Sequence, residues 1–261
     1  MNAEIHTADY GTEGPRVVFC HGLFGQGRNW THIARSLADA YRVTLLDLPN
    51  HGRSAWTDRI DYLQMADAVA ALASEDDPIA LVGHSLGGKV AMALALRHPD
   101  VVAKLCVVDI APAAHSSGSE FRRYIDAMQQ MDLATIHNRQ DAEDALTEAV
   151  PDASVRAFLL QNLRRDGASW RWQANLDLLG RDLETIAGWP AALRDAEPYR
   201  GPVLWLAGAN SDYITEDDAP VMRKLFPRVH KISIKGAGHW VHADQPEIFL
   251  NVVRGFLAAS Q

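Results

Sequence analysis

The stretch LVGHSLGGKVAMA, residues 81–93, governs the interpretation of the whole sequence. An apolar run leads into GHSLG at residues 83–87, and small apolar residues at helical spacing follow directly. A serine at a sharp strand-to-helix turn presents its hydroxyl at the edge of a sheet, and flanking glycines leave room for the strained backbone. The N-terminus of the following helix favours negative charge beside that hydroxyl. The pattern G-x-S-x-G in this context predicts that Ser85 is a nucleophile.

Short apolar runs alternate with amphipathic segments along the rest of the chain. Strands connected by helices predict an α/β fold with a mostly parallel central sheet that helices cover on both faces. The expected strands are 17–20, 42–47, 79–83, 105–109, 203–207 and 231–235, with a weaker one at 4–9. The expected helices lie near 30–39, 62–74, 86–98, 217–225 and 246–257.

Residues 115–197 interrupt this alternation, because they contain no convincing strand and have a polar, helical composition. A connection of this length is far longer than a crossover needs. We therefore expect a helical cap at 115–197, inserted between the two parts of the core, 1–114 and 198–261. Ligands of open α/β sheets bind at the carboxyl ends of the strands, so a cap at that edge would cover the site.

A serine needs a base, and the chain has eleven histidines to choose from. His239 is favoured because it follows a strand and a glycine loop in IKGAGHWVHADQPE, residues 234–247, which places it beside Ser85. His242 is the alternative, but it should lie one helical turn further on and face elsewhere. His84 is expected to be structural, with its side chain directed away from Ser85.

The base in turn needs a carboxylate that orients it, and two strands end with a candidate. Asp109 ends LCVVDIAP, residues 105–112, in register and between apolar residues that would bury it. A buried acid without a partner is costly, so a histidine partner explains Asp109 well. Asp212 in LWLAGANSDYI, residues 204–214, is the alternative acid, and the neighbouring Ser211 is a candidate hydrogen-bond partner of the base.

Acyl transfer also requires two N–H groups that stabilise an oxyanion. One should be the N–H of Leu86, directly after the serine, and the other should come from the loop after an early strand. That loop, HGLFG at residues 21–25, makes Leu23 the second expected donor. The loop DLPNHGRS at 47–54 lies at the same end of the sheet, and we interpret it as scaffold, with His51 near the chemistry but outside it.

Composition excludes several other classes of protein. The 261 residues carry 33 acidic and 25 basic side chains, a net charge of −8, which argues against nucleic acid as a partner. The N-terminus lacks the pattern of a secretory signal, and no apolar run is long enough for a membrane span, so a cytoplasmic location is expected. Cys20 and Cys106 lie in apolar runs and are expected to be reduced core thiols, and no Cys/His cluster has the spacing of a metal site.

These motifs together resemble the α/β-hydrolase family over nearly the whole chain. The match rests on HGLFG, DLPNHGRS, GHSLGG at 83–88 and GAGHWVHADQPE at 236–247. More narrowly, VDIAP at 108–112, GANSDY at 208–213 and LRRDGASWRW at 163–172 resemble a small subfamily of esterases and acyl thioesterases, which includes bacterial proteins and a mitochondrial mammalian relative. In the general family two residues separate the glycine from the acid, and counted from Gly208 the place of the acid holds Ser211 here. In the subfamily the acid follows the earlier strand, which supports Asp109.

The resemblance implies hydrolysis of small-molecule carboxylic esters or thioesters without a cofactor or a metal. Ser85, His239 and Asp109 would form the triad, with the N–H groups of Leu23 and Leu86 as the oxyanion hole. The same fold and serine also serve C–C bond hydrolysis and cofactor-free perhydrolysis, and a non-catalytic ligand-binding protein is a further alternative. The oligomeric state cannot be predicted from these motifs.

The cap carries apolar and basic residues that bear on the substrate. Its apolar residues would line an acyl tunnel or, equally well, form the packing of the cap itself: Phe121, Phe158, Leu159, Leu160, Trp170, Trp172, Leu176 and Leu179. Its paired arginines, Arg122, Arg123, Arg164 and Arg165, could meet a phosphate of coenzyme A, although a solvated cap face is the simpler interpretation.

Overall fold

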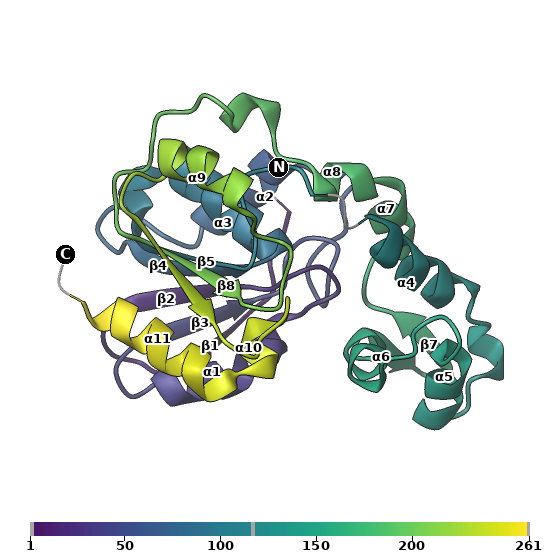
Figure 1. The fold of residues 1–261 in the computed structure, drawn as a ribbon. Helices are drawn as coiled ribbons and strands as arrows, with labels where there is room; N and C mark the ends of the chain where they lie inside the picture. The colour runs from purple at the N-terminus through teal and green to yellow at the C-terminus, as the bar shows by residue number, and fades with distance from the viewer. Residues whose placement is uncertain (1–2, 116–117, 260–261) are drawn as a thin grey trace.

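A seven-stranded sheet forms the centre of the computed structural model, which describes residues 3–115 and 118–259 (Figure 1). The strands lie in the order β1-β3-β2-β4-β5-β8-β9, and every neighbouring pair is parallel except β1 with β3. The predicted, mostly parallel sheet is thus confirmed. Its strands are β1 (Thr7–Tyr10), β2 (Arg16–Cys20), β3 (Arg42–Leu46), β4 (Ile79–His84), β5 (Val102–Val108), β8 (Val203–Gly208) and β9 (Val229–Ile234).

Helices cover both faces of this sheet (Figure 1). Along β2, Val17 and Phe19 belong to one buried cluster, whereas Val18 and Cys20 belong to the other, because successive side chains of a strand point to opposite faces. One face is covered by α1 (Thr31–Leu37), α10 (Val241–Asp244) and α11 (Pro246–Ala258), and the other by α2 (Tyr62–Ala70), α3 (Leu86–Arg97) and α9 (Ala219–Leu225).

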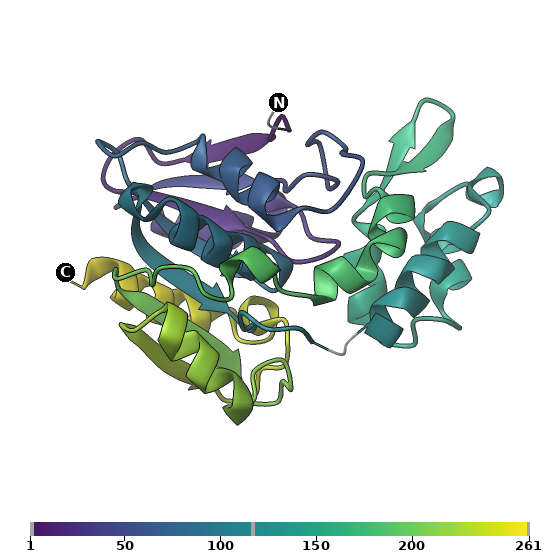
Figure 2. The same ribbon diagram turned by 90° about the horizontal axis from the view of Figure 1, so that it is seen from above.

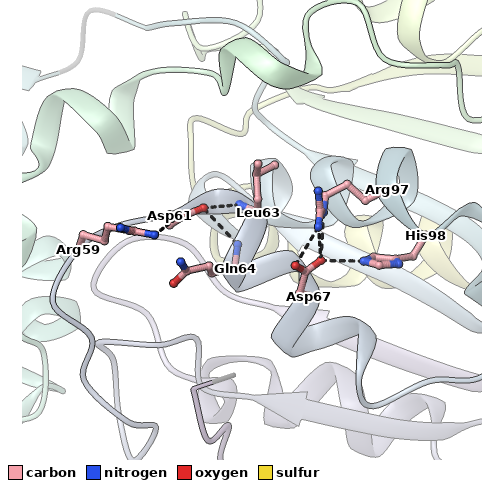
Figure 3. A network of polar contacts seen from close by, with 7 residues as sticks. All are labelled: Arg59, Asp61, Leu63, Gln64, Asp67, Arg97 and His98. Atoms are coloured by element: carbon pink, nitrogen blue, oxygen red, sulfur yellow. Dashed lines mark hydrogen bonds and ion pairs between the residues drawn. The ribbon is translucent and has the colours of Figure 1, made fainter. Parts of the chain in front are cut away.

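The helix α3, which begins directly after Ser85, is held between the sheet and α2. Every residue of 86–96 is buried, so the helix has almost no solvent-exposed face. Asp61 caps α2 by accepting hydrogen bonds from two N–H groups of its first turn. Asp67 of α2 then binds Arg97 and His98 at the end of α3, at 2.9 Å and 2.7 Å (Figure 3). These contacts fix the direction of α3 and therefore of its N-terminus at Ser85.

The strand register brings the carboxyl ends of β4, β5 and β8 together. Val108 of β5 lies beside His84 of β4 and beside Leu206 of β8. The N–H of Ser85 donates to the carbonyl of Val108 at 3.0 Å, and the N–H of Asp109 donates to the carbonyl of Leu206 at 2.7 Å. The sheet itself therefore fixes how Ser85 and Asp109 lie relative to each other.

A mainly helical insertion follows β5 and lies to one side of the sheet (Figures 1 and 2). Its longest helix, α4, buries Tyr124, Ile125 and Met128 at helical spacing. The predicted helical cap is present, while the exact division at 115–197 stays a prediction. The elements of the insertion are α4 (Gly118–Gln130), η3 (Leu133–Thr135), α5 (Arg139–Leu146), α6 (Ala153–Leu160), β6 (Leu163–Asp166), β7 (Ser169–Trp172), α7 (Leu176–Arg181), α8 (Leu183–Ala187) and η4 (Ala191–Leu193).

The expectation that residues 115–197 contain no strand is wrong, because β6 and β7 form an antiparallel hairpin. Each strand has four residues, and Gly167 in the turn has a φ of +62°, a conformation that glycine adopts without strain. The guanidinium of Arg165 lies 5.0 Å from the centre of the Trp170 ring across the pair. Asp166-Gly167 is a hairpin signal that the polar composition of the cap obscured.

Both cysteines are buried and free, as predicted. Burial raises the pKa of the Cys20 thiol to about 12 and raises that of Cys106 as well, so both remain protonated at neutral pH. In residues 3–115 and 118–259, no helix combines the length and the apolar character that crossing a bilayer requires.

Candidate active site

Ser85 occupies the strained turn that the sequence predicts. Its φ of 52° and ψ of −118° are unusual for a residue with a side chain. A Cβ on Gly83 would come within 2.3 Å of the carbonyl oxygen of Gly87, and a Cβ on Gly87 within 2.4 Å of that of His21. Both glycines are therefore required by close backbone approaches around the serine.

Three side chains form a continuous hydrogen-bonded chain at this edge of the sheet. Oγ of Ser85 lies 3.0 Å from Nε2 of His239, and Nδ1 of the same ring lies 2.8 Å from Oδ2 of Asp109. A hydroxyl that donates to an imidazole, which in turn donates to a buried carboxylate, is the arrangement that activates a serine for attack on a carbonyl. The structure thus brings together the three residues that the sequence favoured.

Asp109 is fully buried, and each of its oxygens has a partner. Oδ1 accepts from the N–H of Gly208 at 2.9 Å, and Oδ2 accepts from the hydroxyl of Ser211 at 2.5 Å as well as from His239. Ser211 therefore contacts the carboxylate rather than the imidazole, which differs from the contact suggested by sequence. Asp212, the alternative acid, is exposed at the surface.

The imidazole of His239 is held from two sides. The ring of Tyr213 stacks on it with centroids 3.7 Å apart and planes 19° apart. Nε2–H of His84 donates to the backbone carbonyl of His239 at 2.8 Å, and the centroids of the two rings lie 4.7 Å apart, so His84 supports the position of His239. Burial lowers the pKa of His84 well below its ordinary value, with His239 and His242 as further causes, and keeps this ring neutral.

His242 and His51 lie outside the hydrogen-bonded chain. The ring of His242 packs against Trp30, with centroids 4.1 Å apart, and against His84. His51 is fully buried, and its Nδ1 lies 3.0 Å from the carbonyl oxygen of Pro49. Burial lowers the pKa of each imidazole to about 3, so both are neutral at physiological pH.

The two residues expected to supply oxyanion-hole N–H groups, Leu23 and Leu86, lie at the same pocket as Ser85. Within residues 3–115 and 118–259 neither N–H has a hydrogen-bond acceptor. The loop of Leu23 approaches closely, since a Cβ on Gly22 would lie 3.2 Å from Cβ of Ser85. His21 fixes this loop by accepting from the N–H of Leu48 through Nε2 at 2.9 Å and donating from Nδ1 to the carbonyl of Gly22 at 2.8 Å. Two unpaired donors beside a serine hydroxyl can stabilise an oxyanion.

The pocket beside Ser85 is small, with a volume of about 30 Å³. Of the eight apolar cap residues named above, all of which the structure describes, Phe121 alone lines it. Leu159, Leu160, Leu176 and Leu179 are buried in the packing of the cap instead. The remaining lining is Leu23, Leu86, Lys89, Ile110, His115, Leu183, Ile186, Ala187 and Tyr213.

Lys89 is a pocket residue that sequence reasoning missed. It lies one helical turn after Ser85 and is only 2% exposed. Its Nζ donates to the carbonyls of Ile186, Ala187 and Gly188 at 3.3, 2.7 and 2.6 Å, where α8 ends and the chain returns from the cap. Burial lowers the pKa of Lys89 to about 7. A lysine within the otherwise apolar and small residues of 86–96 was the signal that could have indicated this role.

The four cap arginines do not all lie at one place: Arg122 and Arg123 are on α4, and Arg164 and Arg165 are on β6. Arg122 donates to the carbonyl of Gly180, and Arg123 lies over the ring of Tyr124. Arg164 and Arg165 belong to the hairpin at another part of the cap. Across the part of the chain that the structure describes, His, Cys, Asp and Glu side chains form no group of three that could hold a metal ion.

The sheet, the strained serine turn and the cap define an α/β hydrolase. The model of the alpha/beta hydrolase fold family matches residues 15–246, and the chain belongs to this family. Mus musculus has a relative, the sn-1-specific diacylglycerol lipase ABHD11, that is 39% identical over 252 residues, covering 94% of this chain and 81% of the relative. Esterase YbfF of Escherichia coli is 32% identical over 261 residues, covering 98% of each chain. A solved marine microorganism esterase superposes with a TM-score of 0.92 at 34% identity, covering 97% of this chain and 99% of the other.

These relatives are consistent with the esterase subfamily that the motifs resemble, and they support a hydrolase of the ester type. The mouse relative is named for a small molecule, diacylglycerol, as its substrate.

Proposed function

We propose that this protein is a serine hydrolase that cleaves carboxylic esters or thioesters through an acyl-enzyme on Ser85. The observation that carries the proposal is the chain of contacts from Ser85 to His239 at 3.0 Å and from His239 to Asp109 at 2.8 Å. The esterases and the lipase among the relatives support the same reaction class.

The reaction begins when Oγ of Ser85 attacks the acyl carbonyl carbon while Nε2 of His239 takes the hydroxyl proton. Asp109 keeps Nδ1 of the ring protonated and stabilises the imidazolium that forms. The N–H groups of Leu23 and Leu86 donate to the negatively charged carbonyl oxygen. The C–O or C–S bond then breaks, and the alcohol or thiol leaves with the proton from His239. Water, deprotonated by His239, attacks the acyl-enzyme in the same way and releases the acid.

The volume of the pocket supports a short acyl group. Pockets that hold drug-sized ligands have volumes of roughly 300–1,000 Å³, whereas the space beside Ser85 is about 30 Å³. Leu183 and Ile186 on α8 close the pocket from the cap side. Long acyl chains would need these cap residues to move, so we propose that acetyl and propionyl esters are cleaved fastest.

The test is a panel of p-nitrophenyl esters and acyl-CoA thioesters, from acetyl to palmitoyl, on wild type and Ser85→Ala. The substitution should reduce kcat by about 10⁶-fold while the protein stays folded, as measured by circular dichroism. Ser36→Ala is the matched control, because this serine lies on α1 and its hydroxyl contacts only its own helix, at the carbonyl of His32. A folded Ser85→Ala protein that kept most of the activity would contradict the proposal. If the protein hydrolyses neither the esters nor the thioesters, the result would instead favour C–C bond hydrolysis or a binding role.

A further inference from the structure

A basic hollow lies between the sheet edge and the hairpin of the cap, apart from the serine pocket. It has a volume of about 680 Å³. Core elements on one side are β1, the loop after β3 and the short helix η1 (Gly27–Trp30), and the β6–β7 hairpin forms the other side, beside that loop (Figure 2). Five arginines from three separate segments line it: Arg28, Arg53, Arg164, Arg165 and Arg171.

Four of these arginines lack an acidic partner among the residues that the structure describes. Within residues 3–115 and 118–259, Arg171 is the one member that forms an ion pair, with Asp166 at 3.4 Å. Arg28 and Arg165 donate to the carbonyls of Gln161 and His137. These bonds orient the guanidinium groups without neutralising their charge. The charge is unexpected in a protein with a net charge of −8.

Asp47 is the carboxylate among the described residues that line the hollow, and it accepts hydrogen bonds from backbone N–H groups. It is 6% exposed, and its oxygens accept from the N–H of Gly27 at 2.7 Å and from the N–H of Arg53 at 2.9 Å. Asp47 therefore joins η1 to the loop after β3 and fixes two sides of the hollow. Because its oxygens are directed at these N–H groups, the guanidinium groups remain available to a ligand.

Neutral hydrogen-bonding groups complete the lining. Gln26 and Gln173 are almost fully buried there, and Oε1 of Gln173 accepts from Nε of Arg164 at 3.0 Å, which fixes that guanidinium. Nε2 of Gln26 donates to Oδ1 of Asn162 at 3.0 Å, which ties the core side of the hollow to the cap. These contacts fix Arg164 and the junction of core and cap, while Arg28, Arg53, Arg165 and Arg171 are exposed side chains around the same hollow.

We propose that this hollow binds a small molecule that carries phosphate groups. Guanidinium groups match phosphate oxygens with paired hydrogen bonds, and several of them around one cavity favour a ligand with more than one phosphate charge. The volume is within the range of small-ligand pockets, roughly 300–1,000 Å³. The proposal concerns binding and does not depend on the ester chemistry at Ser85.

The first experiment titrates inorganic pyrophosphate into the whole protein by isothermal calorimetry at physiological ionic strength. Wild type should bind saturably, and the double variant Arg53→Gln/Arg164→Gln should raise Kd by at least about tenfold. The matched control is Arg35→Gln/Arg223→Gln, which removes the same charge from exposed positions on α1 and α9 and should leave Kd unchanged. Thermal unfolding midpoints establish that each variant is folded.

If the double variant does not fold, Arg53→Gln alone replaces it, since within residues 3–115 and 118–259 the side chain of Arg53 makes no hydrogen bond or ion pair. A wild-type Kd for pyrophosphate of about 1 mM or weaker would overturn the proposal. An equal loss of binding in the control pair would also overturn it, because the effect would then be one of net charge. Co-sedimentation with phosphatidylglycerol vesicles but not phosphatidylcholine vesicles, without pyrophosphate binding, would assign the hollow to lipid headgroups and reject a small-molecule ligand.

Discussion

Nδ1 of His239 lies 2.8 Å from Oδ2 of Asp109, although 130 residues separate the two in sequence. Asp109 follows β5 directly, and β5 lies beside the strand that carries Ser85, so the acid is as firmly placed as the serine. Asp212, which follows the next strand, is exposed instead. The carboxylate that contacts His239 therefore comes from the end of a core strand and not from the later loop.

Replacing Asp109 with asparagine should abolish most of the activity. An amide holds the wrong tautomer of His239 and cannot stabilise its cation, so kcat should fall by roughly 10⁴-fold. Asp212→Asn is the matched control and should leave kcat near that of wild type. Steady-state hydrolysis of p-nitrophenyl acetate measures both, and the opposite ranking would assign the acid to Asp212.

Lys89 should couple the position of the cap to activity. In Lys89→Met the carbonyl of Gly188 loses its donor, and unfolding should become easier by about 1–3 kcal/mol. The junction of cap and core also forms part of the pocket through Ile186 and Ala187, so kcat/KM should fall as well.

Lys104 offers a matched control for this substitution. Its Nζ likewise donates to three carbonyls, those of Phe256, Leu257 and Ala259 at the end of α11, away from the cap. Lys104→Met should lower stability in urea unfolding experiments but leave kcat/KM unchanged. Equal losses of kcat/KM in the two variants would show that Lys89 acts through general stability alone.

Leu183 should limit the length of the acyl group. It closes the pocket at Ser85, so Leu183→Ala should raise kcat/KM for octanoyl relative to acetyl esters by up to about a hundredfold, the effect of a few methylene groups. Leu179→Ala removes the same atoms from a fully buried position that does not line the pocket. The ratio of octanoyl to acetyl turnover should stay constant in that control. A ratio unchanged in Leu183→Ala would mean that the acyl chain lies elsewhere.

The fold and the main site residues could be predicted because each has a local signature. All seven strands of the sheet lie within a few residues of the predicted runs. For the five inner strands the reason is that a buried parallel strand is a short apolar segment between turn residues, whereas β1 and β9 are edge strands that include exposed residues. Ser85 directly follows such a segment, His239 follows the glycine loop after another strand, and the common edge of a parallel sheet brings them together.

The cap was less predictable because its contacts are long-range. The hairpin depends on Gly167 and on contacts between arginine and tryptophan side chains, which a polar composition conceals. In the sequence Lys89 is simply one residue of a predicted helix. Its three carbonyl partners come from the segment where the chain returns from the cap, which the sequence does not place beside it. The converging arginines of the hollow come from residues 28, 53 and 164–171, a grouping with no signature in sequence.

Because it buries neutral imidazoles, we expect the free energy of unfolding of this protein to fall in acid. Burial, with the nearby His21 as a second cause, lowers the pKa of His51 from 6.5 to about 3. Between these values the unfolded chain binds a proton that the folded protein does not, so His51 stabilises the fold fully above pH 6.5 and less as the pH falls toward 3. From neutral pH to about pH 5 this single group should remove about 2 kcal/mol from the free energy of unfolding.

His51→Asn tests this dependence, because an amide does not titrate and can still donate to the carbonyl of Pro49. The variant should be less stable at neutral pH, owing to the smaller side chain, but its free energy of unfolding should fall less steeply with pH. His230→Asn, at an exposed position of β9, should keep the slope of wild type. Urea unfolding followed by tryptophan fluorescence at several pH values gives the slopes. A His51→Asn protein with the wild-type slope would show that the acid lability arises from other groups.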